Sequence, residues 1–270
     1  MNFLVLGDIF PTALKFLETK IPLIRKKKKI DFIIANAENV ATDANGITIK
    51  NAKRLFNIGI DVLTSGNHIW DKKEILRYIK SEKRLLRPAN MHDDLPGVGV
   101  NIFMKDEKKI CVINLMTNFY MMKSKNVFQT AKLLLKKNKL KKKLDYIIVD
   151  IHGEFAGEKI ALGHLFDGKS TVVFGSHTHV PSADAMILSK GTAYQTDLGM
   201  CGDYDSVIGL DKRIFLKKML KSKNKKKNKP ASGKPSICGS IIKADKKTGL
   251  ALSIEQIMIG GKLDKKNKHG

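Results

Sequence analysis

Residues 146–179 decide the fold that the sequence predicts. They open with the apolar run YIIVD (146–150), continue through a helix-like stretch near 158–166, and end with TVVF (171–174) and GSHTH (175–179). Two β-rich apolar runs separated by a helical length are typical of a strand–helix–strand unit in a layered α/β fold. Both runs lead into histidines, so the strand ends are the first place to look for chemistry.

The same alternation extends toward the N-terminus, while the C-terminal part follows a different pattern. Earlier strands are predicted at 3–6, 32–35, 61–64 and 109–115, with helices at 13–26, 48–58, 71–80 and 126–142. Later runs at 185–188, 192–196, 236–243 and 250–259 read as antiparallel strands, the last two joined by a turn at Gly249. We therefore expect one α/β domain over residues 1–270, with a more antiparallel second half.

The basic charge is large but confined to a few segments. The chain of 270 residues has a formal net charge of +24. Residues 20–30, 132–143, 212–234 and 262–268 carry six, seven, eleven and four Lys or Arg, with Asp264 as their single acid. The rest is near neutral and few aromatics interleave, so we expect solvated lysine patches with a weak, non-specific attraction for RNA. A mobile basic loop is predicted at about 217–234 and a basic tail at about 262–270.

Composition excludes several classes of protein. Hydrophobic residues make up 43% of the chain, which excludes wholesale disorder. No apolar run approaches the roughly 18 residues of a membrane span, and the N-terminus lacks the pattern of a secretory signal. Three scattered cysteines suggest free thiols, so we expect a cytoplasmic protein without membrane contact. Nucleotide-cofactor motifs of the GxxxxGK[ST] or GxGxxG type are absent.

Ligand-type side chains follow five of the predicted strands. They are Asp8, then Glu38 and Asn39, then Asn67 and His68, then His152, then His177 and His179. Loops at the carboxyl ends of parallel strands share one rim, where ligands bind. Carboxylate, amide and imidazole groups suit Mn²⁺, Fe²⁺ or Zn²⁺. Without His68, the other seven side chains are still too many ligands for one ion, so we expect two divalent metal ions bridged by Glu38, with iron or manganese favoured and zinc permitted.

These residues together amount to a resemblance. The motifs are Gly7-Asp8, Asn36-Ala37-Glu38-Asn39, Ser65-Gly66-Asn67-His68, Arg87-Pro88-Ala89-Asn90, Asp150-Ile151-His152, Gly175-Ser176-His177-Thr178-His179 and Gly191–Met200. In this order they resemble the calcineurin-like metallophosphoesterase superfamily, and within it the bacterial YmdB-type dinuclear phosphodiesterases. The resemblance covers nearly the whole chain. It implies a four-layer α/β/β/α sandwich and hydrolysis of cyclic nucleotides, both 2′,3′-cyclic and 3′,5′-cyclic.

The resemblance also assigns roles to single residues. Asp8, Glu38, Asn39 and His179 would hold one metal, while Glu38, Asn67, His152 and His177 would hold the other. A hydroxide bridging the metals would attack phosphorus, and His68 would protonate the leaving alkoxide. An open alternative for His68 is a ring that only orients a ligand or the bound water.

Two stretches depart from the family pattern. After Gly7-Asp8, the family has a Gly- and Pro-containing turn that ends in Arg, whereas this chain reads IFPTALK (9–15). This difference bears on substrate preference more than on metal binding. The second departure is the lysine-rich stretch 217–229, which is longer and more basic than the family connection.

Two other functions stay open from the sequence. One is a phosphomonoesterase or nucleotidase of the same superfamily. Comparing hydrolysis of AMP with that of 2′,3′-cyclic AMP would distinguish it from a phosphodiesterase. The other is a catalytically inactive RNA-binding protein that uses the lysine patches. The intact set of seven donors argues against the inactive protein. Homo-oligomer formation is left open.

Overall fold

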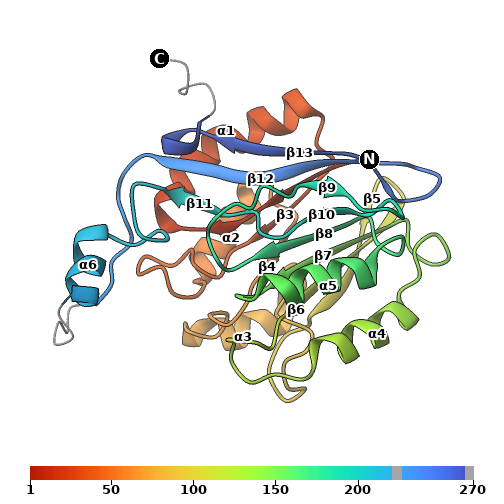
Figure 1. The fold of residues 1–270 in the computed structure, drawn as a ribbon, viewed down its shortest axis with the longest axis horizontal. Helices are drawn as coiled ribbons and strands as arrows, with labels where there is room; N and C mark the ends of the chain where they lie inside the picture. The colour runs from red at the N-terminus through yellow and green to blue at the C-terminus, as the bar shows by residue number, and fades with distance from the viewer. Residues whose placement is uncertain (221–226, 265–270) are drawn as a thin grey trace.

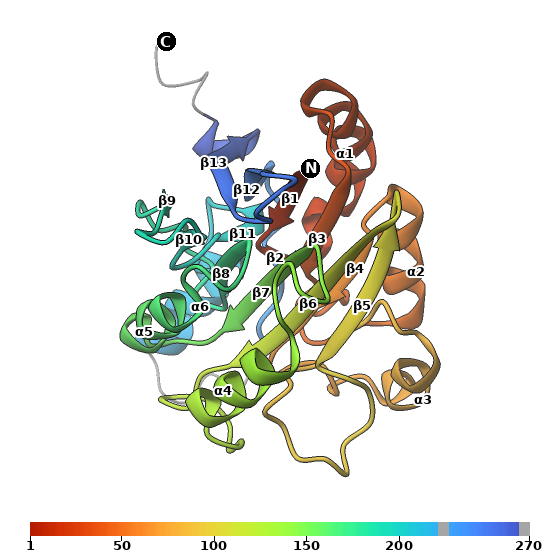
Figure 2. The same cartoon turned by 90° about the vertical axis from the view of Figure 1, so that its right-hand side faces the viewer.

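Two β-sheets pack face to face, and helices cover the outer face of each sheet (Figures 1 and 2). This arrangement is seen in a computed structural model of the chain, which describes residues 1–220 and 227–264. The layers run α/β/β/α. They confirm the four-layer sandwich that the sequence predicts.

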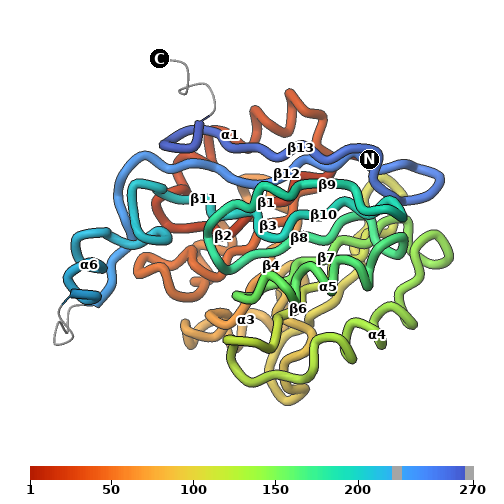
Figure 3. The backbone as a smooth tube through the Cα atoms, viewed as in Figure 1, coloured from red at the N-terminus to blue at the C-terminus, as the bar shows by residue number. Residues whose placement is uncertain are grey.

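The first sheet joins the start of the chain to its end. Its hydrogen-bonded order is β2 (Asp8–Ile9), β11 (Met200–Asp203), β12 (Pro235–Ala244), β1 (Asn2–Leu6), β3 (Phe32–Asn36) and β4 (Val62–Thr64), with β13 (Ala251–Ile259) beside β12. Strands β1, β3 and β4 are parallel, whereas β12 is antiparallel to β1. The red first strand and the blue late strands therefore lie side by side (Figure 3).

The second sheet comes from the middle of the chain. Its order is β5 (Val100–Lys105), β6 (Lys108–Met116), β7 (Tyr146–His152), β8 (Val172–Ser176), β10 (Ala193–Gln195) and β9 (Met186–Ile187). The four inner strands are parallel, and β5 and β9 are antiparallel edges. Residues 146–179 therefore contain the central β7–α5–β8 unit of this sheet.

Alternation along β1 explains how one strand serves two hydrophobic cores. Phe3 and Val5 point between the sheets, where the Phe3 ring packs 5.2 Å from the Tyr146 ring. Leu4 and Leu6 point the other way, into the core under the outer helices. Those helices are α1 (Leu14–Lys28), α2 (Ile49–Ile58) and α3 (Lys73–Ser81) on the first sheet, and α4 (Val127–Lys137) and α5 (Ala156–Phe166) on the second.

The structure differs from the prediction at α4, β10 and β5. Helix α4 ends at Lys137 rather than near 142, because Asn138 leaves the helix and its amide donates to the Leu134 carbonyl. Strand β10 was predicted to be antiparallel, and it is antiparallel to β9 on one side but parallel to β8 on the other. Edge strand β5 was not predicted, since most of its residues are partly exposed and it has no continuous apolar run.

The first residues of the basic loop predicted at about 217–234 are helical. Residues 217–220 form the end of helix α6 (Lys212–Leu220), because the apolar residues of 214–220 follow a helical spacing. Residues 221–226, and 265–270 of the predicted tail at 262–270, lie outside the described residues. Short 3₁₀ helices occur at Pro11–Ala13 and Gly261–Leu263. Along 1–220 and 227–264, every helix is too short or too polar to cross a membrane.

Candidate active site

The predicted site residues come from both sheets. Asp8 opens β2, Glu38 and Asn39 follow β3, and Asn67 follows β4, all in the first sheet. His152 ends β7, and His177 and His179 follow β8, in the second sheet. The sequence placed these side chains on a common rim. The structure brings six of them together at the edge where strand ends of the two packed sheets meet, namely Asp8, Glu38, Asn67, His152, His177 and His179. The seventh, Asn39, directly follows Glu38 in the chain.

Glu38 and His152 form the centre of the cluster. Glu38 Oε1 lies 2.9 Å from His152 Nε2, and both side chains are fully buried. The same nitrogen lies 3.2 Å from Asn67 Oδ1 and 3.1 Å from His177 Nδ1. Glu38, His152 and His177 form a group whose ligand atoms lie within 4.8 Å of one another. Oxygen and imidazole donors converging on one point are the composition of a transition-metal site.

Asp8 and His179 form a second pair beside this centre. Asp8 Oδ1 lies 3.8 Å from His179 Nε2, and Asp8 Oδ2 accepts a hydrogen bond of 3.0 Å from the His177 backbone N–H. His179 Nδ1 is 2.9 Å from the Ile208 carbonyl, so it carries the proton and leaves Nε2 directed at Asp8. This is the tautomer that a metal-binding imidazole requires.

Buried oxygens without hydrogen bonds test whether the site suits metal ions. Among the described residues, Asp8 Oδ1, Glu38 Oε1 and Asn39 Oδ1 are buried and accept no hydrogen bond. The Asn39 side-chain N–H donates to the Ala44 carbonyl, and this bond fixes the orientation of the amide. Glu38 Oε1 lies beside the His152 ring, but the contact does not have hydrogen-bond geometry. Buried polar atoms normally have partners. Asp8 Oδ1 and Glu38 Oε1 lie in the cluster beside imidazole nitrogens, and buried carboxylate oxygens without hydrogen bonds fit cation ligands.

The electrostatics of the cluster also favour positive charge. Burial would raise the pKa of Glu38, but attraction to His152 outweighs it and lowers that pKa to about 2. Burial opposes the charged form of His152, yet Glu38 raises its pKa to about 9. Burial raises the pKa of Asp8 to about 8, although His152 opposes the shift. The protonated His152 ring thus supplies a positive charge next to the Glu38 and Asp8 carboxylates, as a metal ion would.

Local structure holds the His152 ring in place. Its Nδ1 lies 3.0 Å from Ser176 Oγ, which in turn donates to buried Asp150 at 2.8 Å. Opposite the ring stands Gly66, where any side chain would overlap the imidazole. His177 and His179 have φ values of +102° and +65°, a left-handed backbone that is strained for residues other than glycine. Strain of this kind concentrates at functional sites.

His68 contacts the cluster through its backbone. Its backbone N–H donates to Glu38 Oε2 at 3.0 Å, while its ring is partly exposed. Ring atom Nδ1 lies 2.7 Å from Asp71 Oδ2, which leaves Nε2 free to face a bound molecule. A carboxylate behind an imidazole is the usual way to fix the tautomer of a proton-transfer histidine.

Several residues around the cluster were not predicted. Asn36 is the last residue of β3, Asp150 lies within β7 and Lys159 lies in α5, so none of the three comes after a strand. Of the histidines that do not belong to the cluster, His92 and His164 are exposed, and His269 lies outside the described residues. Of the residues that were not predicted, Asn36 gave the clearest signal in the sequence, because it lies only two residues before Glu38.

This sandwich, with a buried carboxylate–imidazole cluster at the strand ends, defines a protein of the metallophosphoesterase class. A family model described as YmdB-like protein matches residues 4–257. The chain belongs to the YmdB-like protein family, which confirms the resemblance.

Individual relatives are similar to the chain over nearly its whole length. A 2′,3′-cyclic-nucleotide 2′-phosphodiesterase of Bacillus subtilis is 37% identical over 265 residues, covering 96% of this chain and 97% of the relative. The crystal structure of a hypothetical protein from Thermus thermophilus has a TM-score of 0.89 and 32% identity, covering 97% of this chain and all of the other. A novel phosphatase of Mycoplasma pneumoniae also has a TM-score of 0.89 and 32% identity, covering 96% and 93%.

Proposed function

We propose that the protein is a metal-dependent phosphodiesterase that hydrolyses cyclic nucleotides, with 2′,3′-cyclic nucleotides as the first substrate class and 3′,5′-cyclic nucleotides as the second. The observation that carries this proposal is the position of two buried carboxylate oxygens, Asp8 Oδ1 and Glu38 Oε1, which accept no hydrogen bond and lie beside imidazole nitrogens where the two sheets meet. The printed name of the Bacillus subtilis relative supports the substrate class.

Two divalent metal ions per chain would occupy the cluster. Asp8, Glu38, Asn39 and His179 would hold one, and Glu38, Asn67, His152 and His177 the other. Iron or manganese suits this set best and zinc is permitted, because carboxylate, amide and imidazole ligands occur without thiolates. When bound, such ions polarise phosphoryl oxygens and acidify water.

The protein's own side chains would handle protons and orientation. His68, with Nδ1 held by Asp71, would donate its Nε2 proton to the leaving alkoxide. Its partly exposed ring can reach a substrate, whereas the rings of His152 and His179 are enclosed. The His68 backbone N–H meanwhile keeps Glu38 oriented. This residue would therefore serve the site through two separate atoms.

Hydrolysis of a diester and of a monoester separates the two catalytic alternatives. The phosphatase name of the Mycoplasma pneumoniae structure keeps monoester hydrolysis as the second candidate. Purified protein should hydrolyse 2′,3′-cyclic AMP and bis(p-nitrophenyl) phosphate but not AMP, lose activity with EDTA and regain it with Mn²⁺. Faster hydrolysis of AMP would indicate a phosphomonoesterase. Salt-sensitive RNA binding without metal-dependent hydrolysis would indicate an inactive RNA-binding protein.

We further propose a weak, non-specific attraction for RNA through the lysine patches, a cytoplasmic location, and association into a homo-oligomer. The lysines that end α1 and those that follow α4 are mostly exposed, which supports the first point. The three cysteines are free and buried, which is compatible with a reducing compartment. RNA binding should weaken steeply as salt rises, and sedimentation would give the oligomeric state.

A further inference from the structure

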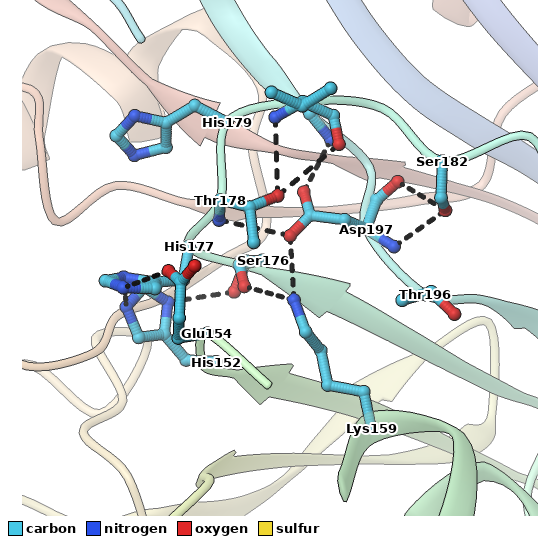
Figure 4. A network of polar contacts seen from close by, with 12 residues as sticks. His152, Glu154, Lys159, Ser176, His177, Thr178, His179, Ser182, Thr196 and Asp197 are labelled. Carbon is cyan, nitrogen blue, oxygen red and sulfur yellow. Dashed lines mark hydrogen bonds and ion pairs between the residues drawn. The ribbon is translucent and has the colours of Figure 1, made fainter. Parts of the chain in front are cut away.

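A buried ion pair lies directly behind the loop that carries His177 and His179. Lys159 Nζ of α5 donates to Asp197 Oδ2 at 2.8 Å, and the two side chains are 1% and 3% exposed (Figure 4). Burying an ion pair costs desolvation that its attraction often fails to recover, so stability alone is a weak reason for it. Its contacts indicate another role.

The Asp197 carboxylate links segments from both sheets. Its Oδ2 accepts a hydrogen bond of 3.2 Å from the Thr178 backbone N–H, and its Oδ1 accepts one of 2.8 Å from Gly199 N–H. The Gly199 carbonyl accepts in turn from the backbone N–H of Asp8 at 3.1 Å. One carboxylate thus ties the histidine loop of the second sheet to the strand that carries Asp8 in the first.

Contacts of the pair flank the strained part of the loop. Lys159 Nζ also donates to the Ser176 carbonyl at 3.0 Å, and Asp197 binds Thr178 N–H, so the two bonds lie on either side of His177. His177 and His179 both have positive φ. A backbone of this kind persists only where its surroundings hold it. Lys159 and Asp197 supply such contacts from the side away from the cluster.

We infer that Lys159 and Asp197 are a positioning pair, which fixes the 177–179 loop and Asp8 in the arrangement that receives the metal ions. The inference rests on the proposed function, since it concerns the same metal site. Without Lys159, the Asp197 carboxylate is left buried without its cation, and the loop and Asp8 lose their shared anchor. Metal affinity therefore depends on two residues that are not among the proposed metal ligands.

A second ion pair provides a matched control. Arg25 of α1 donates to Asp61 Oδ2 at 2.7 Å, and Asp61 also accepts from Ile33 N–H, so this pair too joins a helix to strand backbone. Asp61 precedes β4, whereas the site follows the opposite end of that strand. Loss of the Arg25 pair should lower thermal stability and leave the site intact.

The test is Mn²⁺ titration by calorimetry on full-length wild type, Lys159→Met, Asp197→Asn, the double variant and Arg25→Met, with circular dichroism and thermal unfolding for each. Wild type should bind two Mn²⁺. Lys159→Met and Asp197→Asn should bind about 10–100-fold more weakly, the usual cost of removing support behind metal ligands. Arg25→Met should bind like wild type although it melts earlier.

The double variant keeps the test decisive if a single variant fails to fold. It removes both charges, so it avoids an unpaired buried ion, but the amide that replaces the Asp197 carboxylate has one oxygen and can accept from only one of the two backbone N–H groups. Weakened Mn²⁺ binding by a folded double variant supports the inference. Wild-type affinity in a folded Lys159→Met or double variant overturns it, whereas a wild-type protein that binds no Mn²⁺ overturns the proposed function itself.

Discussion

Glu38 and His152 lie 2.9 Å apart, although one follows a strand of the first sheet and the other ends a strand of the second. The contact exists only because the sheets pack face to face with these strand ends at the same edge. Sandwich formation and assembly of the site are therefore one event. A variant that disturbs this contact without unfolding the sandwich therefore distinguishes effects on metal binding and catalysis from effects on folding.

Glu38→Gln is such a variant. It keeps the size of the side chain and removes the charge that attracts His152 and would bridge two cations. We expect metal binding to fall and turnover to drop at least about a hundredfold, since several kcal/mol of transition-state stabilisation depend on the ions. Metal content and hydrolysis of 2′,3′-cyclic AMP measure the two effects. Retention of two ions with full activity would exclude Glu38 as the bridging ligand.

His68→Ala should separate catalysis from metal binding. The backbone N–H that supports Glu38 stays, so metal content should equal that of wild type, while turnover falls about 10²–10⁴-fold. Asp71→Asn should cause a smaller loss, because the amide oxygen still accepts from Nδ1. Loss of metal from His68→Ala would instead show that the ring orients a ligand, the alternative that the sequence left open.

Gly66→Ala should damage the site through a single methyl group. A Cβ at this position would overlap the His152 ring, so the imidazole must move away from Glu38 and Asn67. We expect reduced metal content and activity with a nearly unchanged circular dichroism spectrum. Gly157→Ala is the control, because its Cβ would meet only the partly exposed Phe155 ring at 2.9 Å. Equal behaviour of the two variants would contradict this steric reading.

Metal binding should release protons near neutral pH. In the metal-free protein at pH 7, His152 (pKa about 9) and Asp8 (pKa about 8) are protonated, whereas Glu38 (about 2) and His177 (about 3) are not. Binding therefore displaces up to about two protons, and affinity rises with pH until both groups have titrated. Calorimetry in buffers of different ionisation enthalpy counts the protons. Release that does not decline by about pH 10 would contradict the assignment.

The sequence predicted the fold well where apolar runs are continuous. The runs ending at Leu6, Asp150 and Phe174 became β1, β7 and β8, because buried parallel strands need uninterrupted apolar residues. Strand β5 escaped prediction because an edge strand tolerates polar residues. Helix α6 was not predicted, because its many lysines hide a weak apolar spacing.

For the site, the sequence could identify ligands but not their supports. His177 and His179 stand out because two histidines follow a strand directly. Lys159 and Asp197 do not, since a lysine in a predicted helix is normally solvated. Lys159 is only 1% exposed because α5 packs against β8 and the segment after β10, and no local sequence pattern encodes this packing. Tertiary burial decides which polar residues support a site.

Anomalous diffraction from crystals of Mn²⁺-loaded protein tests the central claim most directly. A two-metal site predicts two manganese peaks about 3.5–4 Å apart, with the Glu38 carboxylate between them, His152 and His177 on one ion, and Asp8 and His179 on the other. Manganese bound away from Glu38, or no peak within reach of these side chains, would contradict the proposal that the cluster is a dinuclear hydrolytic centre.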